Sequence, residues 1–459
     1  IWRIHGSHLS QHSHHSWQLA SRIQQLRNVR RLLKMKIKKI LIITISTCLA
    51  IAFTGCSKRE KNGENNSVAS SDAPKSAVPN SFDKVTANLD KSGDMFIYLS
   101  TEQIISTADQ YLNDITQSIE TTESINDIIK AGKTALNQSG IMDISGIGMS
   151  RVEIEPNLFR QKIAVHHEES KSDGKIWSIL GSKEPRQLEL FKLLPEDTVL
   201  AISNEFNAKV LFDWFPELAS ATDNPEIEEQ VKVAMSIASL MLQTPASLES
   251  LGNQFSLFIT LDKKEKTYLP PELGGEIPNP GLAIAIEILN DKVPDMIFQA
   301  LEAQGAPMEE QTINGTKSLV FTEASPFPFP VSPTIFKLDN HFILASSEEL
   351  AKNIISTHQG NAPRLTSTEE FKQLSKGLNT EANHMLYLGK RFAQSLAPAI
   401  KSLIESAGDL PPEIPIDINS IPFDITKLNP EEMIKLRLLA FIKNNKNGMI
   451  IESQSSIVN

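Results

Sequence analysis

Short apolar runs separated by turn residues dominate the chain beyond residue 90. The sharpest case is Asn314-Gly315, which lies between the segments 310–313 and 317–321. Asn-Gly readily takes the left-handed conformations that two-residue hairpin turns need. Similar turn residues predict three more hairpins, at 172–174, at Asp339-Asn340 and at Asn447-Gly448. Four hairpins predict antiparallel sheets.

Helical periodicity appears between these strands. Apolar residues recur every three or four positions over 104–119, after a capping-box spacing at 100–103, which predicts a helix with one stripe packed against a sheet. Further helices are predicted over 123–136, stopped near Gly140, and over 228–242. The predicted fold class is therefore α+β, with antiparallel sheets built from hairpins and helices packed on one face.

A strand followed by a helix recurs three times, beginning at 95–99, 198–203 and 384–389. Gap-free alignment matches Tyr98 with Tyr387 and Phe206 with Phe392. A further strand running into a helix is predicted before the second and third units, at 176–182 and 342–346. We interpret the pattern as a degenerate internal repeat, with convergent strand-helix patterning as the alternative.

Proline-rich stretches interrupt the pattern at 269–280, 325–333 and 410–415. Because proline removes ladder donors, these stretches are predicted to be loops or polyproline segments rather than sheet. Phe327 and Phe329 within the second stretch are candidates for an exposed contact with lipid or a partner, or for side chains that return to the core.

The segment from Met35 to Cys56 has a basic start and then no charge over 40–54. That run is shorter than the roughly 20 apolar residues of a membrane-spanning helix, and it has the parts of a secretory signal. Its end, Phe53-Thr54-Gly55-Cys56, resembles the lipobox of bacterial lipoproteins. The resemblance implies cleavage after Gly55 and lipid on the Cys56 sulfur. An ordinary signal peptide with a chance cysteine is the alternative.

A lipid anchor would place the protein at the cell envelope. A single acyl chain holds a protein only marginally, whereas multiple acylation gives a durable membrane anchor. By resemblance, Ser57 rather than Asp after the cysteine suits outer-membrane sorting, with the body facing the periplasm.

Composition divides the chain into six predicted segments. Residues 1–34 begin with Ile1, are rich in histidine and contain no acid, so they are interpreted as translated upstream sequence or an artificial leader, with a metal-binding tract as the alternative. The others are a signal peptide at 35–55, a disordered tether at 56–85, a first α+β lobe at 86–195, a second at 196–383, and a C-terminal partial repeat at 384–459 that completes the sheet.

Charge and cysteine usage change with the predicted cleavage. Nine of the 45 basic residues and none of the 55 acidic ones lie in 1–55, which leaves 36 basic against 55 acidic groups and a formal net charge of −19. Such a body repels nucleic acid, so no nucleic-acid partner is expected. Because Cys48 lies within the signal, no disulfide or thiolate metal site is expected either.

Two motifs resemble chemical sites weakly. In 166–169, His-His-Glu-Glu, the two adjacent histidines of a strand point to opposite faces, so only His166 and Glu168 could share an ion; a solvated strand end is the preferred interpretation. In 145–151, Gly146, Gly148 and Ser150 fit neither a dinucleotide loop nor a nucleophile elbow, because a required glycine is missing from each. A strand of small residues is predicted instead, with no catalytic residue, metal or cofactor.

The segments 146–150, 158–165, 193–200 and 340–347 resemble patterns in uncharacterised exported bacterial proteins grouped as a domain of unknown function. That family brings no catalytic residues. The leading hypothesis is a lipid-anchored envelope protein that acts by binding or scaffolding, with the membrane and an envelope protein as partners. The alternatives are an envelope hydrolase with dispersed catalytic residues and a carrier of apolar ligands. Enzyme activity is left open, with a binding role preferred.

Overall fold

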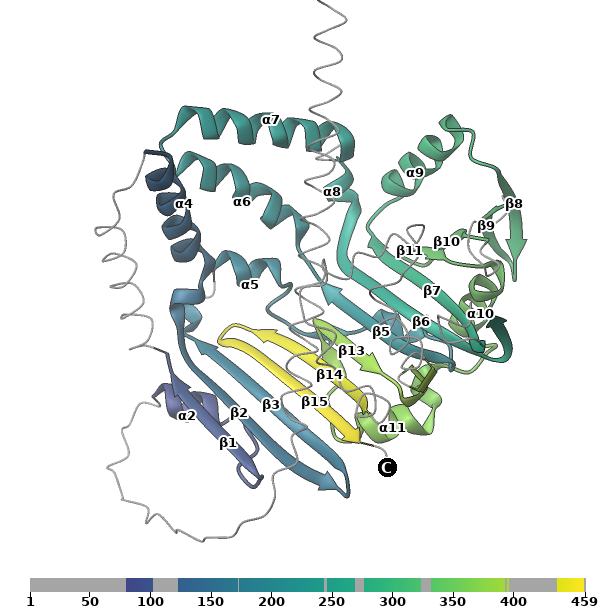
Figure 1. Cartoon of the computed structure of the whole chain (residues 1–459), viewed down its shortest axis with the longest axis horizontal. Helices are drawn as coiled ribbons and strands as arrows, with labels where there is room; N and C mark the ends of the chain where they lie inside the picture. The colour runs from purple at the N-terminus through teal and green to yellow at the C-terminus, as the bar shows by residue number, and fades with distance from the viewer. Residues whose placement is uncertain are drawn as a thin grey trace, which may run out of the picture. The chain divides into compact units, whose positions relative to one another are not determined.

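The computed structural model describes most of the chain beyond residue 79 (Figure 1). The described residues are 80–101, 123–171, 173–242, 246–268, 276–322, 332–392, 394–395 and 436–457. All of them belong to one compact unit, made of 68–403 and 430–459. Several predicted features lie outside the described residues: the signal peptide, most of the tether, the helix over 104–119, Phe327 and Phe329, and the proline-rich stretch 410–415.

Thirteen strands form one antiparallel sheet in the order β1-β2-β3-β15-β14-β13-β5-β6-β7-β11-β10-β9-β8. The remaining two, β4 (Arg186–Gln187) and β12 (Glu381–Ala382), pair with each other. In chain order the strands of the large sheet are β1 (Met95–Ser100), β2 (Ile144–Glu155), β3 (Leu158–His167), β5 (Thr198–Glu205), β6 (Leu251–Tyr268), β7 (Glu276–Ile288), β8 (Met308–Ile313), β9 (Thr316–Phe321), β10 (Thr334–Leu338), β11 (His341–Ala345), β13 (His384–Leu388), β14 (Leu436–Asn445) and β15 (Gly448–Ile457). The α+β class and its antiparallel pairing are thereby confirmed.

Three groups of strands share one connectivity: β1-β2-β3, β5-β6-β7 and β13-β14-β15. In each group the first strand pairs with the second and the second with the third. The connection after the first strand is long every time, covering 101–143, 206–250 and 389–435. Antiparallel neighbours need only a two-residue hairpin, so each group inserts a long excursion at the same point. The pairings of β3 with β15 and of β13 with β5 join the groups into one sheet.

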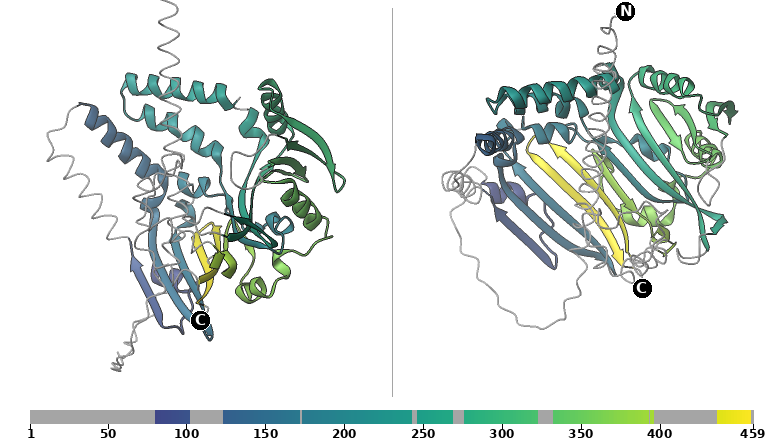
Figure 2. Two further views of the ribbon diagram at one scale, coloured as in Figure 1. Left: turned by 45° about the vertical axis from the view of Figure 1, so that its right-hand side comes forward. Right: turned by 45° about the horizontal axis from the view of Figure 1, so that its top comes forward.

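The helices fall into two sets (Figures 1 and 2). One set packs on the sheet: α2 (Ser81–Thr86) on β1 to β3, α10 (Glu348–His358) on β7, β8, β10 and β11, and α11 (Glu369–Ser375) on β14 and β15. The other set lies beyond the upper ends of the strands in Figure 1 and comprises α4 (Glu123–Ser139), α5 (Lys175–Ile179), α6 (Ala208–Ser220), α7 (Pro225–Leu242), α8 (Ala246–Ser250) and α9 (Lys292–Ala303). Of these, α9 also packs on β10 and β11. Among the described helices, none combines the length and hydropathy that a membrane crossing requires.

One face of the sheet, which we call the core face, carries the main hydrophobic core. Its inward residues include Phe258, Tyr387 and Phe441, all buried. Leu350 of α10 and Phe371 of α11 belong to the same core, so these two helices cover the core face. Fully burying a side chain of this size stabilises a fold by about 1.5–3 kcal/mol, so this layer holds the sheet in shape.

The predicted turns at Asn314-Gly315 and Asp339-Asn340 are confirmed. Ile313 pairs with Thr316 across the first turn, and Leu338 pairs with His341 across the second. Asn314 and Asp339 both have positive φ, at 47° and 48°, which is the left-handed conformation that Asn and Asp tolerate best. The hairpin predicted at Asn447-Gly448 also forms, between β14 and β15. Its turn is Lys446-Asn447, because Asn445 pairs with Gly448.

The hairpin predicted at 172–174 is wrong. The following segment forms the helix α5 and not the strand predicted over 176–182, and it buries Trp177 and Ile179. The Trp177 ring lies 4.9 Å from that of His167 and its Nε1 donates to the Gly140 carbonyl. These contacts come from distant parts of the chain, so they override the local β-propensity of Ile and Trp.

Two prolines of the stretch 269–280 lie in sheet, contrary to prediction. Pro278 and Pro280 belong to β7 and pair with Lys266 and Leu261 of β6. The other neighbour, β11, pairs with β7 only from Ala283 onward. This part of β7 is therefore locally an edge strand, where a missing N–H costs no ladder hydrogen bond.

The end of the predicted tether is ordered. Residues 81–85 belong to α2, and Val85 is fully buried against the sheet. Asn80 caps this helix with a capping box that it forms with Asp83. One buried valine and a satisfied cap are enough to attach a short helix whose surrounding composition is polar.

Candidate functional site

His166 and His167 lie at the end of β3, and the prediction that they are solvated is wrong. Both are buried, at 8% and 1% exposure. Burial is the main cause that lowers the pKa of His166, so its ring is neutral near pH 7. The two rings face opposite sides of the sheet, as the strand alternation predicts.

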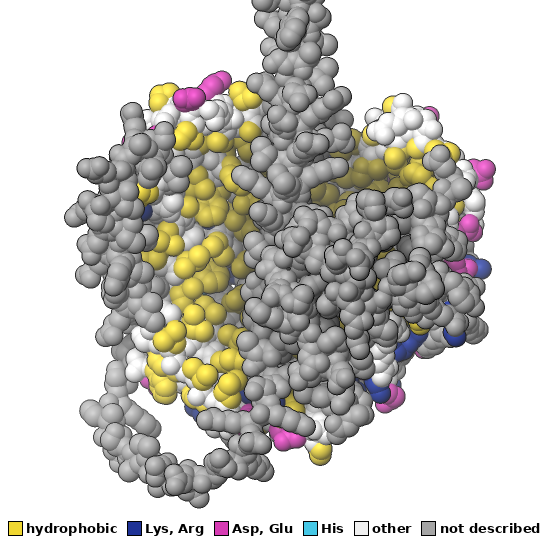
Figure 3. Space-filling model, viewed as in Figure 1, with side chains coloured by type: hydrophobic (Ala, Val, Ile, Leu, Met, Phe, Trp, Pro, Cys, Tyr) yellow, Lys and Arg dark blue, Asp and Glu magenta, His cyan; other side chains and the backbone are white. Residues whose placement is uncertain are grey.

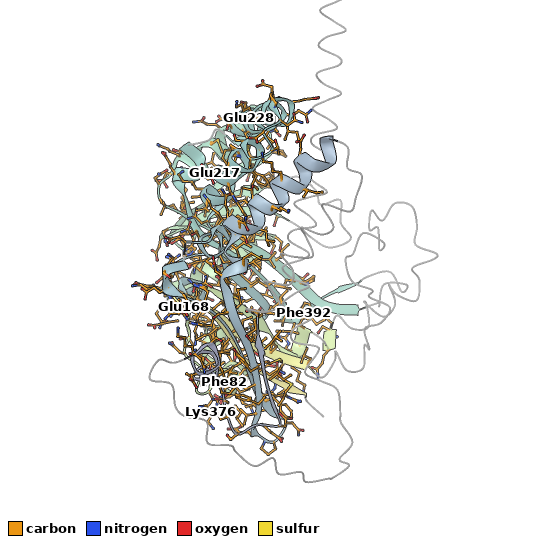
Figure 4. The ribbon with its side chains drawn as sticks, turned by 90° about the vertical axis from the view of Figure 1, so that its left-hand side faces the viewer. Phe82, Glu168, Glu217, Glu228, Lys376 and Phe392 are labelled. Carbon is orange, nitrogen blue, oxygen red and sulfur yellow. The ribbon has the colours of Figure 1, made fainter. Side chains whose placement is uncertain are left out.

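Glu168 lies near His166 but is bonded to Lys84. Its carboxylate accepts a hydrogen bond from Lys84 Nζ at 2.7 Å, and it lies 3.8 Å from His166 Nε2. The hydrogen bond from Lys84 lowers the pKa of Glu168. Among the described residues no three His, Cys, Asp or Glu side chains are grouped for a metal. In Figure 4, Glu168 and Phe82 lie at one flank of the sheet.

A pocket of about 420 Å³ lies beside His166. Its lining includes Lys183, Glu184 and Lys446. Lys183 pairs with Asp173, and Lys446 lies 3.7 Å from a carboxylate oxygen of Glu169. Because acids accompany the lysines, the pocket offers no strong charge with which to select an ion.

The small residues of β2 serve packing. Gly148 faces α2, where an added Cβ would overlap the side chains of Val85 and Leu89. Ser150 is fully buried and its Oγ accepts the Asp90 N–H at 3.0 Å. The prediction of a strand with small residues is therefore confirmed, and the glycines let α2 approach the sheet closely.

A hydrolase site would need a histidine near Ser150, and the structure does not bring one there. Ser150 lies opposite Lys162 on β3, whereas His166 lies opposite Gly146. His384 is bonded to the Leu180 carbonyl at 2.8 Å, and His341 lies on β11. Within the described part of the chain these groups form no nucleophile-and-base arrangement.

A buried ion triad was missed by the sequence reasoning. Arg186 places its Nε 2.9 Å from Glu205 and its two terminal nitrogens 2.9 and 3.2 Å from Glu287. The carboxylate side chains are only 3% and 8% exposed. Burial acts to raise the pKa of Glu287, but hydrogen bonds and charge from Arg186 outweigh it, so the pKa lies below its usual range.

The triad closes one end of the core face. Glu287 also accepts the backbone N–H groups of Asn253 and Gln254 at 3.1 and 3.0 Å, and Glu205 accepts from Ser182 N at 3.0 Å. A sequence signal for it existed, since Glu287 interrupts the apolar run 282–288 at a core-facing position. Every carboxylate is satisfied by the protein, which makes this a structural network.

The other face of the sheet, which we call the aliphatic face, carries aliphatic side chains in two rows. Cross-strand register aligns five of them over the first five strands in space: Ile97, Met149, Ile163, Ile451 and Ile442. It aligns five more over the next five strands: Leu386, Ile202, Leu257, Ile284 and Leu344. Each of ten neighbouring strands thus contributes at least one residue.

The aliphatic face is less buried than the core face. Ile97 and Leu344, at its two ends, are 52% and 39% exposed, and the eight residues between them are half-buried. The space-filling view shows hydrophobic side chains gathered over β2, β3 and β15 (Figure 3). At a strand spacing of about 4.8 Å, ten strands span on the order of 40 Å.

Polar groups also lie on the aliphatic face, among them His384 and Asn204 in the row of Ile442. Arg151 and Gln161 lie opposite each other on β2 and β3, and Ser453 of β15 lies opposite Gln161. The Arg151 guanidinium sits 4.0 Å from the centroid of the Phe159 ring and 3.4 Å from Asp94. Its charge is therefore compensated within the protein.

Helices border this face. At one end they form a small buried core with it, in which residues of α9 pack on Ile288, Ile335 and Phe342. Phe298 of α9 packs on Phe342 of β11, with ring centroids 5.8 Å apart. At the upper end, α6 buries only Ala219 of its thirteen residues and leaves Phe215 49% exposed. In Figure 4, Glu217 of α6 and Glu228 of α7 lie above the sheet.

Neither the cleavage site nor the lipidation site can be placed in the fold. Gly55 and Cys56 lie outside the described residues, so both stay predictions. No family model, no curated protein and no solved structure matches this chain. The resemblance to lipoproteins and to exported proteins of unknown function therefore stays a prediction, and functional inference rests on the fold and its surfaces.

Proposed function

We propose that this protein is a lipid-anchored, non-catalytic binding protein of the cell envelope that holds the acyl chains of lipids against its aliphatic face. The observation that carries the proposal is the series of aliphatic residues across ten strands, from Ile97 to Leu344. Removing such surface from water is favourable by about 25 cal/mol per Å², and each buried methylene of a chain adds about 0.8 kcal/mol.

The composition of the aliphatic face favours acyl chains over a protein partner. Protein interfaces concentrate their binding energy in Trp, Tyr and Arg. The ten residues that define the face are Ile, Leu and Met, and Arg151 on the same face is already paired with Phe159 and Asp94. A face on the order of 40 Å wide exceeds one leaflet of hydrocarbon, about half of the roughly 30 Å bilayer core, so it has room for an extended chain.

The predicted anchor supports the same function. A body tethered through Cys56 by a polar segment of about 25 residues stays within reach of membrane lipids. The mature net charge of −19 disfavours adsorption of the whole body on anionic headgroups. Contact with lipid would then be made by the aliphatic face and not by charge. An envelope protein partner remains the alternative occupant.

Native mass spectrometry of the full chain tests the proposal, because the detergent is stripped in the gas phase and tightly held lipid is not. We expect one or more lipid adducts on the wild type. The double substitution Ile202→Asn and Leu257→Asn should reduce their occupancy at least about tenfold, the equivalent of 1.4 kcal/mol. Leu289→Asn is the matched control, since Leu289 is 66% exposed and lies beyond the end of β7.

Two results would count against the proposal. One is wild-type protein that carries no adduct. The other is equal lipid occupancy in the double variant and the control, with circular dichroism showing that all three chains are folded. Adducts of protein mass in place of lipid would favour the envelope-partner alternative.

We also propose that the three strand groups are copies of one internal repeat. Its support is the shared order of the three strand groups and the similar lengths of the excursions 101–143, 206–250 and 389–435. Tyr98 and Tyr387, matched in the sequence, both point to the core face of their first strands. The parallel drawn between 176–182 and 342–346 gives no support, because the first is α5 and the second includes β11.

A further inference from the structure

Strand β1 is the outermost strand of the sheet that the structure describes. Its residues Met95–Ser100 pair only with β2, so one side of its backbone has no strand partner in the described sheet. The six residues include no charge and no proline. At the opposite edge, β8 presents Glu309 and Glu310, both exposed. Natural sheets protect their edges with such charges, and β1 lacks them.

Large apolar side chains are exposed on both faces of the sheet at this edge. On the aliphatic face, Ile97 and Leu99 are 52% and 47% exposed. On the core face, Phe96 of β1 and Phe82 of α2 are 41% and 46% exposed. Single exposed hydrophobic residues need no explanation, but a group of four around one open edge marks an interaction site.

We propose that β1 pairs antiparallel with β1 of a second copy of this chain, so that two sheets join about a two-fold axis. The axis would be perpendicular to the sheet and would pass midway between the Tyr98 residues of the two copies. Antiparallel neighbours on one face must keep the same parity, so this register places Ile97 of one copy opposite Leu99 of the other, twice. On the aliphatic face apolar residues then meet apolar residues, whereas on the core face Tyr98 meets Tyr98 and Phe96 lies opposite Ser100.

A second copy fits this edge better than an unrelated strand does. The strand carries no charge that would require a complementary charge on its partner. The two-fold pairing also makes the aliphatic faces of both copies continuous, since Ile97 ends the series on each. Isologous contacts of this kind are the commonest way in which chains form closed dimers. The pairing uses only the edge of β1 and does not depend on lipid binding.

Disulfide trapping in intact cells tests the pairing. Opposite residues of an antiparallel pair have Cβ atoms about 4.5–5.5 Å apart, within reach of a disulfide after a small adjustment. The variant carrying Ile97→Cys and Leu99→Cys should give a covalent dimer on a non-reducing gel after mild oxidation. Leu289→Cys and Glu309→Cys, exposed elsewhere, are the controls and should yield at most about a tenth of that dimer.

A dimer that forms equally in the controls would show random collision and overturn the proposal. Absence of the dimer, or trapping of a different protein, would overturn it as well. Because the cysteine variant can fail to fold, sedimentation of the wild type in detergent provides a second measurement. It should show two copies per particle, and Ile97→Lys with Leu99→Lys should reduce this to one. A monomeric wild type contradicts the pairing.

Discussion

Replacing Arg186 with Met should destabilise the protein through the two carboxylates that the arginine compensates. Glu205 and Glu287 keep their buried positions in the variant, at 3% and 8% side-chain exposure. Methionine fills much of the space of the arginine stem but supplies no charge or donor. The core face would then hold two buried carboxylates that repel each other and have no cation between them.

The magnitude follows from the burial of each partner. Removing one member of a buried ion pair costs about 3–5 kcal/mol, because the remaining charge is left uncompensated. Arg186 is 41% exposed, and Glu287 keeps its backbone donors from Asn253 and Gln254. We therefore expect about 3 kcal/mol. This is a large share of the 5–15 kcal/mol that holds a typical domain.

Urea denaturation of the full chain in detergent, followed by tryptophan fluorescence, measures this loss. At a slope of about 3 kcal/mol per molar urea, the midpoint should fall by about 1 M at pH 7. Adding Glu287→Gln to Arg186→Met should restore part of the loss, since one of the two orphaned charges is then removed. Arg186→Lys should fall between the wild type and the methionine variant.

The pH dependence of the stability loss provides a second, independent test of the charge effect. In the wild type the pKa of Glu287 is depressed, so its stabilisation is present above the unfolded pKa and is lost as the pH falls through the folded value. In the variant, burial without Arg186 should raise that pKa. The destabilisation is then complete at neutral pH and is relieved on acidification, so the gap between the two proteins should narrow from pH 7 to pH 5.

Two outcomes would refute this reasoning. A loss below about 1 kcal/mol would mean that water reaches the carboxylates and that the triad behaves as a surface pair. A gap between wild type and variant that stays constant or widens on acidification would mean that the loss comes from packing and not from charge. The double variant separates these cases, because only a charge effect is rescued by Glu287→Gln.

The remaining predictions concern the anchor, the packing of α2 and the buried histidines. Replacing Cys56 with Ala should abolish incorporation of labelled fatty acid, and persistent labelling would show that lipid is attached elsewhere. Gly148→Ala should lower the free energy of unfolding by about 1–3 kcal/mol, because the added methyl overlaps Val85. Gly132→Ala in α4 should raise it by about 0.5–1 kcal/mol, because nothing lies within 4 Å of the added methyl. Equal effects of the two substitutions in urea titrations would contradict this. Burial lowers the pKa of His341 and of His384, so unfolding takes up protons below about pH 6.5 and stability should fall as the pH drops from 7 to 5. A flat profile in wild-type urea titrations would contradict that assignment.

Local signals predicted the parts of the fold that depend on local structure. Asn314 and Asp339 adopt the left-handed turn conformations expected of their residue types. The helix over 123–136 and its stop at Gly140, which has φ of 83°, follow from periodicity and from glycine at the helix end. Such elements form largely from residues within a few positions of one another.

The errors lie where distant residues decide the conformation. Residues 175–179 are helical because Trp177 packs on His167 and bonds to Gly140, contacts that no local window includes. Pro278 is compatible with β7 because β11 ends short of it. Both outcomes depend on the order of strands in the sheet, which the sequence pattern does not specify.

The candidate site was hidden for the same reason. The aliphatic face joins residues as far apart in sequence as Ile97, Ile284 and Ile451. Each strand alone shows only a few half-buried aliphatic residues, which is normal for a sheet. The continuity arises from the register of ten strands, and with it the hypothesis of a carrier of apolar ligands gains a physical basis that the sequence did not supply.

The most direct test of acyl-chain binding is to ask what touches the aliphatic face in the cell. A benzophenone amino acid placed at Leu257, and separately at Leu386, should crosslink on illumination to lipid, seen as a lipid-mass adduct on the peptide that carries it. The same group at Leu289 should give little or none. Lipid adducts confined to the two face positions are what we predict. Protein adducts there, or equal yields at all three positions, would contradict the account.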